Sequence, residues 1–374
     1  MTPRPRGARA LFNDLTRGLS SGEIRRLLDR DATRAYSVLM RDQAPPPEKL
    51  RGPGWFFRDV KLLFLSISEK LSPARRALFV LGVASAVLGF LDFELQWSDG
   101  GAQFSLDGSP IFFLVSVASL LFLLILELVD RVLVRDELQV ARQLQRDLLP
   151  KSPPELPGYA FAHSTRMAND IGGDYYQFQP LADGRLAIVV ADASGHGMAA
   201  GLLMAIADAT LHLAIDIDPS PMAVADRLHR ALRRTEDRRS FLTLFYGLLE
   251  PSTGELDYVC AGHPFPLLRR ADGTIEEPSL GSFPLGLRER LAPATGRLRL
   301  EPGDLLLLFT DGLFEGLGGS GESFGFDRLR SALGSSTRAG ESHRRVLDAF
   351  ASHAGAEPLA DDLTLLAIER IGSA

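Results

Sequence analysis

Two long runs of apolar residues occupy the first third of the chain. Residues Gly108 to Leu126 contain no charged side chain over 19 positions, close to the ~20 residues that a helix needs to cross the hydrocarbon core of a bilayer. The run from Ala77 to Leu91 covers 15 residues, a length that a buried helix of a soluble protein also reaches. The pattern therefore predicts two helices, of which the second is the stronger candidate for a membrane span.

The charges that flank these runs favour a hairpin of two spans over 77–126. The charged residues between the runs are all acidic, namely Asp92, Glu94, Asp99 and Asp107. Basic residues stand outside both runs, at Arg75, Arg76, Arg131 and Arg135. Because short cytoplasmic flanks are enriched in Lys and Arg, this distribution predicts a multi-pass protein of the inner membrane. Both ends of the hairpin, and the domain that follows, would face the cytoplasm.

Three further segments surround the predicted hairpin. Residues 1–54 have the pattern of a polar cytoplasmic helical segment that ends in a Pro-rich linker. Residues 55–76 suit a basic helix on an anionic membrane surface, although an ordinary packed helix fits equally well. Residues 127–150 continue as a charged linker helix with an apolar seam at Val134, Leu138, Ala141, Gln145 and Leu148. This spacing is typical of a coiled coil and hence of a homodimer, but a single amphipathic helix packed on its own domain fits as well.

From residue 151 onward, short strand-like runs replace the long apolar ones. The predicted strands are Leu186–Ala191, Phe241–Leu249, Glu255–Cys260, Leu305–Phe309 and Leu363–Ile368. Helical patterns fall at Met198–Ile215, Pro221–Arg234, Phe326–Leu333 and Glu341–Ser352. Strands joined by a hairpin, together with helices in pairs, predict a layered α+β domain over 151–374 rather than βαβ repeats.

The formal net charge of −6 is unevenly distributed. Up to Arg76 there are 16 Lys and Arg against 8 Asp and Glu, and the remainder has 25 against 39. So acidic a remainder argues against nucleic acid as a partner, because phosphate contacts need clustered basic side chains. All four lysines precede residue 152, which excludes P-loop, kinase-type and Schiff-base lysines from the rest of the chain. The single cysteine, Cys260, excludes a disulfide framework and a thiolate zinc cluster.

Acidic residues recur in Gly-rich turns and at the ends of predicted strands. They are Asp174, Asp192, Asp311, Asp361 and Asp362. Carboxylates gathered at strand ends repel one another unless a cation compensates them. An all-oxygen set without Cys or clustered His selects hard ions such as Mg²⁺ or Mn²⁺. Each Asp-Gly pair alone is typical of a simple turn, so the prediction rests on the set as a whole.

The motifs that contain these residues resemble the metal-dependent serine/threonine phosphatases of the PPM family, in particular the bacterial SpoIIE-type regulators of sigma-factor pathways. The resemblance covers about residues 137–370. It begins with the helix Ala141-Arg-Gln-Leu-Gln-Arg-Asp-Leu-Leu-Pro150 and continues through Gly172-Gly-Asp-Tyr-Tyr176, Asp192-Ala-Ser-Gly-His-Gly197, Phe241-Leu-Thr-Leu244, Ala261-Gly-His-Pro264, Pro284-Leu-Gly286, Thr310-Asp-Gly312 and Asp361-Asp-Leu-Thr364. Because all these motifs occur in the order that the family has, chance agreement is implausible.

The resemblance implies an α-β-β-α sandwich of two antiparallel sheets with two ions, Mn²⁺ or Mg²⁺, held between the sheets. By motif, Asp192 would bridge both ions, Asp174 would complete the set, and Ala193 would offer its backbone carbonyl. Asp311 and Asp361 would hold one ion from the opposite sheet, with Asp362 as the rival of Asp361. Water activated by the two ions would then attack the phosphorus atom, and no protein nucleophile would be required.

The resemblance also suggests a substrate, a phosphorylated anti-sigma-factor antagonist protein. His196 could protonate the departing serine or threonine oxygen, because its ordinary pKa lies near neutrality; the alternative is a loop histidine that only shapes the turn. His263 is expected to shape a turn rather than to bind metal.

Three other functions fit parts of the sequence less well. Gly172-Gly-Asp also resembles the signature of diguanylate cyclases, but Tyr175-Tyr176 replaces its Glu-Phe. A cysteine-dependent phosphatase would need Arg six residues after Cys260, where Pro266 stands. The third alternative is a catalytically inactive, membrane-tethered binding module of the same fold, and the retained carboxylates argue against it.

Overall fold

The computed structural model describes residues 55–91, 94–99, 102–195, 197–234, 240–291, 294–319, 321–334, 338–355 and 357–372. The chain divides into two compact units, Met1–Leu133 and Val134–Ala374. The predicted polar segment and linker at 1–54 lie outside the described residues.

The first unit consists of helices and one β-hairpin. Its helices are α4 (Trp55–Lys70) and α5 (Pro73–Gly89), and α6 (Ser109–Leu148) begins in it. Strands β1 (Glu94–Asp99) and β2 (Ala102–Asp107) pair antiparallel between α5 and α6. The connection between the two predicted spans is thus a β-hairpin. The second apolar run and the charged segment after it form one continuous helix of 40 residues.

Small residues line the contact between α5 and α6. Gly82 and Gly89 of α5 are buried, and a Cβ atom at Gly82 would lie 2.9 Å from the side chain of Leu120. A Cβ atom at Gly89 would lie 3.1 Å from the ring of Phe113. Glycine at these two helix positions lets α6 approach closely without displacing either side chain.

An ion-pair cluster joins the same two helices. Arg75 at the start of α5 donates hydrogen bonds to the carboxylates of Glu127 and Asp130 on α6, at 3.0 and 2.7 Å. Because both carboxylate side chains are about half exposed, we expect the cluster to fix the register of the pair rather than to supply much of its stability.

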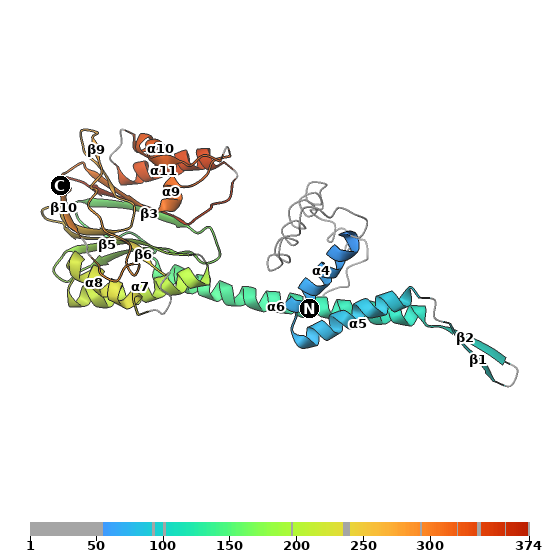
Figure 1. Cartoon of the computed structure of the whole chain (residues 1–374). Helices are drawn as coiled ribbons and strands as arrows, with labels where there is room; N and C mark the ends of the chain where they lie inside the picture. Colours follow the sequence, from blue (N-terminus) through green and yellow to red (C-terminus); the bar gives the residue numbers. More distant parts are fainter. Residues whose placement is uncertain are drawn as a thin grey trace, which may run out of the picture. The chain divides into compact units, whose positions relative to one another are not determined.

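The second unit is a sandwich of two five-stranded sheets (Figure 1). The first sheet has the order β10-β7-β6-β5-β4, and the second β3-β12-β11-β8-β9. Their strands are β3 (Tyr159–Arg166), β4 (Asp174–Pro180), β5 (Leu186–Ala193), β6 (Leu242–Glu250), β7 (Glu255–Ala261), β8 (Leu267–Arg269), β9 (Ile275–Glu276), β10 (Thr295–Arg299), β11 (Leu305–Phe309) and β12 (Leu363–Arg370). Every pairing between them is antiparallel.

Helices cover the outer face of each sheet (Figure 1). On the first sheet lie α7 (Met198–Ile217) and α8 (Pro221–Leu232). On the second lie α9 (Asp311–Phe314), α10 (Gly325–Leu333) and α11 (Ala339–Ala354). The predicted α-β-β-α sandwich is therefore confirmed.

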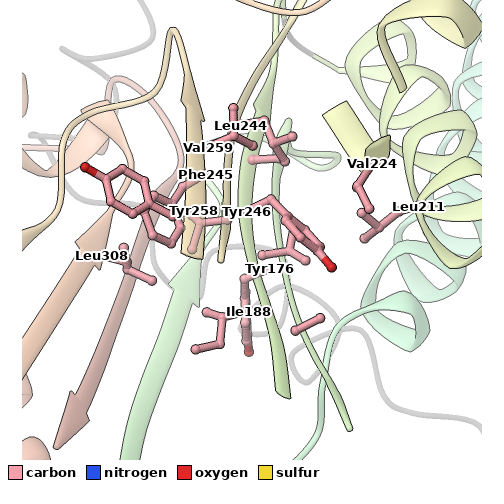
Figure 2. Close-up of a cluster of buried hydrophobic side chains, with 14 of the residues drawn as sticks. Tyr176, Ile188, Leu211, Val224, Leu244, Phe245, Tyr246, Tyr258, Val259 and Leu308 are labelled. Carbon is pink, nitrogen blue, oxygen red and sulfur yellow. The ribbon is translucent and has the colours of Figure 1, made fainter. Parts of the chain in front are cut away.

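The core follows from the two-residue period of the buried strands. Along β11, Leu306 and Leu308 belong to the cluster that also contains the first sheet. Leu305, Leu307 and Phe309 belong to the cluster beneath α9, α10 and α11. Because successive side chains point to opposite faces, a strand covered on both sides is apolar at every position. In Figure 2, Leu308 lies on the opposite side of the first sheet from the helical side chains.

By length and composition, two of the described helices could cross a membrane, α6 and α7. They differ in their surroundings, since 39% of the most apolar window of α7 is buried but only 11% of that of α6. The buried side chains of α7, Leu211 among them, belong to the core of the sandwich (Figure 2). Composition alone therefore does not separate a core helix from a candidate membrane span.

Candidate metal centre

Four of the predicted carboxylates stand at strand ends of the two sheets. Asp174 begins β4 and lies opposite Asp192 of β5 in the strand register. Asp311 follows β11 at the first position of α9, and Asp361 precedes β12 by two residues. Because cross-strand partners point to the same face, Asp174 and Asp192 are like charges directly opposite each other.

The carboxylates repel one another across the two sheets. Burial, together with the negative charges of Asp311 and Asp361, raises the pKa of Asp192 to about 8. Burial, followed by the charge of Asp361, raises the pKa of Asp311 to about 6. Burial raises the pKa of Asp174 well above its ordinary value, and the charge of Asp192 adds to the effect. Such mutual repulsion is what a bound cation relieves.

Glycines keep the space beside these carboxylates clear. A Cβ atom at Gly173 would lie 2.7 Å from the carbonyl oxygen of Ala193 and 2.8 Å from Oδ1 of Asp192. A Cβ atom at Gly172 would collide with the carboxylate of Asp362. The motif thus needs glycine because two of the predicted ligand groups, the Ala193 carbonyl and the Asp192 carboxylate, meet at the backbone of residue 173.

Asp361 and Asp362 have different surroundings. Asp362 is buried, and its Oδ1 accepts a hydrogen bond from the backbone N–H of Ala168 at 2.7 Å. Its Oδ2 accepts one from the N–H of Gly173 at 2.6 Å. Asp361 is exposed, and its Oδ1 accepts a hydrogen bond from the N–H of Asp362 at 2.8 Å. Each oxygen of Asp362 thus already accepts a backbone hydrogen bond from the loop before β4, whereas only Oδ1 of Asp361 does so within the described part of the chain.

Two buried threonines hold Asp174 in place. The Thr310 hydroxyl donates to Oδ2 of Asp174 at 2.7 Å and accepts from the backbone N–H of Thr364 at 2.9 Å. The Thr364 hydroxyl in turn lies 2.8 Å from that of Thr165 on β3. Sequence reasoning missed these residues, although Thr310 directly precedes Asp311 and Thr364 ends the motif that begins at Asp361.

A cavity of about 330 Å³ opens beside Asp192 and Asp311. Its lining includes two further acids that the sequence did not suggest, Glu277 and Glu315. His263 also lines it, and Nδ1 of its buried ring lies 2.9 Å from the hydroxyl of Thr243. Burial lowers the pKa of His263 to about 3, so that the ring is neutral at physiological pH. The predicted proton donor His196 lies outside the described residues.

The donor chemistry of the site fits a hard divalent cation. Its groups are carboxylate and backbone oxygens, the ligands that Mg²⁺ and Mn²⁺ prefer. In the described part of the chain, no three His, Cys, Asp or Glu side chains form a ready-made ligand group. The carboxylates nevertheless raise one another's pKa, as like charges that share a cation site do.

The helix α6 contacts the loop that leads to Asp174. Gln145 is buried, and its side-chain amide donates to the carbonyl of Gly172 at 2.7 Å and accepts from the N–H of the same residue at 3.1 Å. The part of the predicted coiled-coil seam at Gln145 therefore packs within its own unit. This is the arrangement of the alternative hypothesis, an amphipathic helix on its own domain.

Comparison with known proteins places the second unit among phosphatases. The family model described as Stage II sporulation protein E (SpoIIE) matches residues 182–371. Among curated relatives, Protein IcfG of Synechocystis sp. is 25% identical over 313 residues, covering 75% of this chain and 49% of that protein. Phosphoserine phosphatase RsbU of Bacillus subtilis is 26% identical over 183 residues, covering 49% of this chain and 54% of that protein. The chain thus spans about half the length of the curated relatives it matches.

Solved structures share the fold of the second unit. The SiaA-PP2C domain of Pseudomonas aeruginosa matches with a TM-score of 0.57 and 22% identity, covering 64% of this chain and 98% of that one. The RsbU and RsbW domains of Rv1364c from Mycobacterium tuberculosis match with a TM-score of 0.51 and 29% identity, covering 61% of this chain and 64% of that one. These likenesses agree with the sandwich described above.

Proposed function

The chain belongs to the SpoIIE family of PPM phosphatases, and on that premise we propose that it hydrolyses phosphoserine or phosphothreonine in a protein substrate. The observation that carries the proposal is the group of carboxylates contributed by both sheets. Asp192 has a pKa of about 8 because burial and the charges of Asp311 and Asp361 oppose its ionisation. A structural role would not require such uncompensated charges to be gathered in one place.

Each residue of the group has a distinct proposed role toward two Mn²⁺ or Mg²⁺ ions. Asp192, Asp174 and the Ala193 carbonyl would hold the ions from the first sheet. Asp311 and Asp361 would hold one ion from the second sheet. We prefer Asp361 to Asp362 because both oxygens of Asp362 already accept backbone hydrogen bonds. When bound, the ions would supply Lewis acidity to the phosphoryl oxygens and to the attacking water.

The chain's own side chains would orient and shield the reacting group. Thr310 fixes the orientation of the Asp174 carboxylate through its 2.7 Å hydrogen bond. The cavity beside Asp192 has room for a phosphorylated side chain, and Phe265 and Phe314 on its wall would shield the reacting group from bulk water. His196 would deliver a proton to the departing serine or threonine oxygen.

The proposed substrate is a phosphorylated regulatory protein of the anti-sigma-factor antagonist type. Two of the relatives support phosphoserine as the residue that is hydrolysed, since RsbU and RsbP of Bacillus subtilis are named phosphoserine phosphatases. The acidic residues that line the cavity, Glu277 and Glu315 among them, would suit a neutral or basic segment around the phosphorylated residue better than an acidic one.

We further propose that residues 77–126 anchor the protein in the inner membrane, with the phosphatase domain in the cytoplasm. The support is the distribution of side chains in α5 and α6, which is the reverse of that in a water-soluble helix pair. Small residues such as Gly82 and Ser85 lie inside the helix pair, while Leu114 and Phe122 are exposed. Exposed leucine and phenylalanine in such number suit lipid rather than water. The basic segment 55–76 would lie at the cytoplasmic surface of this membrane.

Phosphate release from a phosphoserine form of an anti-sigma-factor antagonist tests the proposed activity. The whole chain is assayed in detergent with Mn²⁺, with Mg²⁺ and with EDTA, and the Asp192→Asn variant is compared with Asp216→Asn, which changes an exposed aspartate on α7. We expect Asp192→Asn to lose at least about 100-fold in rate, or ~2.7 kcal/mol of transition-state stabilisation, and the control to lose nothing. Turnover in EDTA, or full activity of Asp192→Asn, would refute the proposal. Substrate binding without turnover under any metal would indicate the inactive binding module instead.

A further inference from the structure

A second cavity of about 420 Å³ lies within the second unit, where the end of α6 meets β3 and β4. Four basic residues line it: Arg142, Arg146, Lys151 and Arg166. None of the described residues that line it is acidic. This concentration of positive charge is unexpected, because the chain after Arg76 has 25 basic against 39 acidic residues.

The positive charges of this basic cavity have few protein partners, and Arg146, Lys151 and Arg166 are exposed to solvent. Within the described part of the chain, the guanidinium groups of Arg146 and Arg166 have neither an ion pair nor a side-chain hydrogen bond. Nε of Arg142 is buried without a hydrogen-bond partner. Its Nη1 pairs with Asp170 at 3.3 Å, but the carboxylate side chain of Asp170 is 70% exposed, so that pair is weak. Among the described residues, Lys151 pairs with Asp147 alone, at 3.2 Å on the surface.

The remaining walls indicate what kind of anion the basic cavity would take. Leu149, Pro150 and Met167 provide apolar surface, and Tyr176 provides an aromatic ring. A cavity of several hundred Å³ with charged and apolar walls is of a size and chemistry that accommodate a small organic ligand. Guanidinium groups match phosphate oxygens with paired, charge-assisted hydrogen bonds, so an anionic phosphate group joined to an apolar or aromatic portion satisfies both parts of the lining.

We infer that the basic cavity binds a phosphate-bearing anion, with Arg142, Arg146 and Arg166 holding the phosphate group. Two sources share this chemistry, a soluble nucleotide and an anionic lipid headgroup. No lysine or arginine of this cavity lines the cavity of the candidate metal centre, so the two sites are separate.

The position of the basic cavity connects it to Asp174, and this part of the inference rests on the proposed phosphatase function. Between Arg142 and Arg146, Gln145 forms two hydrogen bonds with the peptide groups of Gly172. On the other wall, the hydroxyl of Thr165 lies 2.8 Å from that of Thr364, whose N–H donates to the Thr310 hydroxyl that holds Asp174. An anion bound between α6 and β3 would therefore bias the position of a metal-centre carboxylate from both sides.

Isothermal titration calorimetry of the whole chain in detergent tests binding directly. The probes are pyrophosphate and ATP, and mixed detergent micelles that contain phosphatidylglycerol, with micelles that contain phosphatidylcholine as the neutral comparison. All titrations contain EDTA, so that the metal centre cannot contribute phosphate binding. We expect saturable binding of a soluble probe or of the anionic micelles, and the probe that binds identifies the source of the phosphate.

Variants then locate the binding. Arg146→Ala with Arg166→Ala is expected to weaken affinity roughly tenfold or more, because charge-assisted hydrogen bonds are lost. Arg344→Ala, which removes an exposed arginine of α11, serves as the matched control and should bind normally. Asp192→Asn should also bind normally, which separates this inference from the proposed catalytic activity. No binding of any probe at millimolar concentration, or equal affinity of the double variant and the control, would overturn the inference.

With Mn²⁺ present, the probe that binds should change the rate of phosphate release at least about twofold in the unmodified chain, and not in the double variant. An unchanged rate alongside normal binding would overturn the link to Asp174.

Discussion

Helices α6 and α7 are both apolar enough to cross a membrane, yet their side chains are distributed in opposite ways. In α7, Leu211 and Met204 are buried in the sandwich core. In α6, Ser116 and Ser119 are buried, while Leu114 is 72% exposed. One face of α7 thus packs into the core, although Leu202 and Leu213 are exposed, whereas most of the large apolar residues of α6 point outward. The apolar content of a helix sets how much surface must avoid water, but its neighbours decide whether protein or lipid covers that surface.

The largest contrast is expected when a leucine is truncated in each region. Leu308→Ala should destabilise the sandwich by about 2–5 kcal/mol, because Leu308 is fully buried between the sheets and a cavity would remain. Leu114→Ala should change the free energy of unfolding by less than about 0.5 kcal/mol. Urea unfolding of the whole chain in detergent, followed by near-UV circular dichroism, measures both. Equal changes in the free energy of unfolding would contradict the different surroundings described for the two leucines.

The interior of the second unit also holds carboxylates. The Asp192→Asn variant tests how much their ionisation lowers the stability of the fold. A pKa raised from 3.8 to about 8 means that the folded metal-free chain loses stability as pH rises from about 4 to about 8, because the ionised form is disfavoured. At pH 7.5 in EDTA, Asp192→Asn should therefore be more stable than the unmodified chain by roughly 2–5 kcal/mol. The advantage should vanish near pH 4.

Thermal unfolding at the two pH values checks this prediction. Adding Mn²⁺ should raise the melting temperature of the unmodified chain more than that of the variant. A variant less stable than the unmodified chain at pH 7.5 would show that the carboxylates do not repel one another as described.

An arginine introduced on each helix tests whether lipid or water surrounds that position. Leu114→Arg should impair membrane insertion by about 2.5–3.5 kcal/mol, the cost of arginine within a bilayer. Leu202→Arg is the matched control, because Leu202 of α7 is 63% exposed and would place its charge in water. The fraction of each variant that resists alkaline extraction from membranes is measured. Normal insertion of Leu114→Arg would refute the proposed anchor.

The smallest effect is expected at the close contact between α5 and α6. In Gly82→Val the new Cβ atom would lie 2.9 Å from the side chain of Leu120, and this crowding should cost about 1–3 kcal/mol. Gly340→Val adds the same atoms to α11, where no atom lies within 4 Å of the Cβ position, and should be nearly neutral. Disulfide trapping between cysteines introduced on α5 and α6 would report the separation of the pair. An unchanged trapping rate in Gly82→Val would contradict the packing described.

Much of the sandwich was predictable because its strands are buried and locally apolar. The strand Leu305–Phe309 has the predicted bounds, and Met198 begins the predicted helix α7. Strand β4 was not predicted. It pairs antiparallel with β5 across the short connection at 181–185, and this pairing, rather than a continuous apolar run, gives the segment its strand character.

The candidate metal centre was likewise predictable only in part. The sequence by itself determined the acidic residues, the hard-ion chemistry that they imply and the glycines beside them. Only the tertiary structure decided that Thr310 holds Asp174, that the oxygens of Asp362 are occupied by backbone N–H groups, and that four basic residues meet in one cavity. The physical reason is distance along the chain. Local propensity and periodicity act within one element, whereas Thr310 and Asp174 are separated by 136 positions, and only the packing of two sheets brings them together.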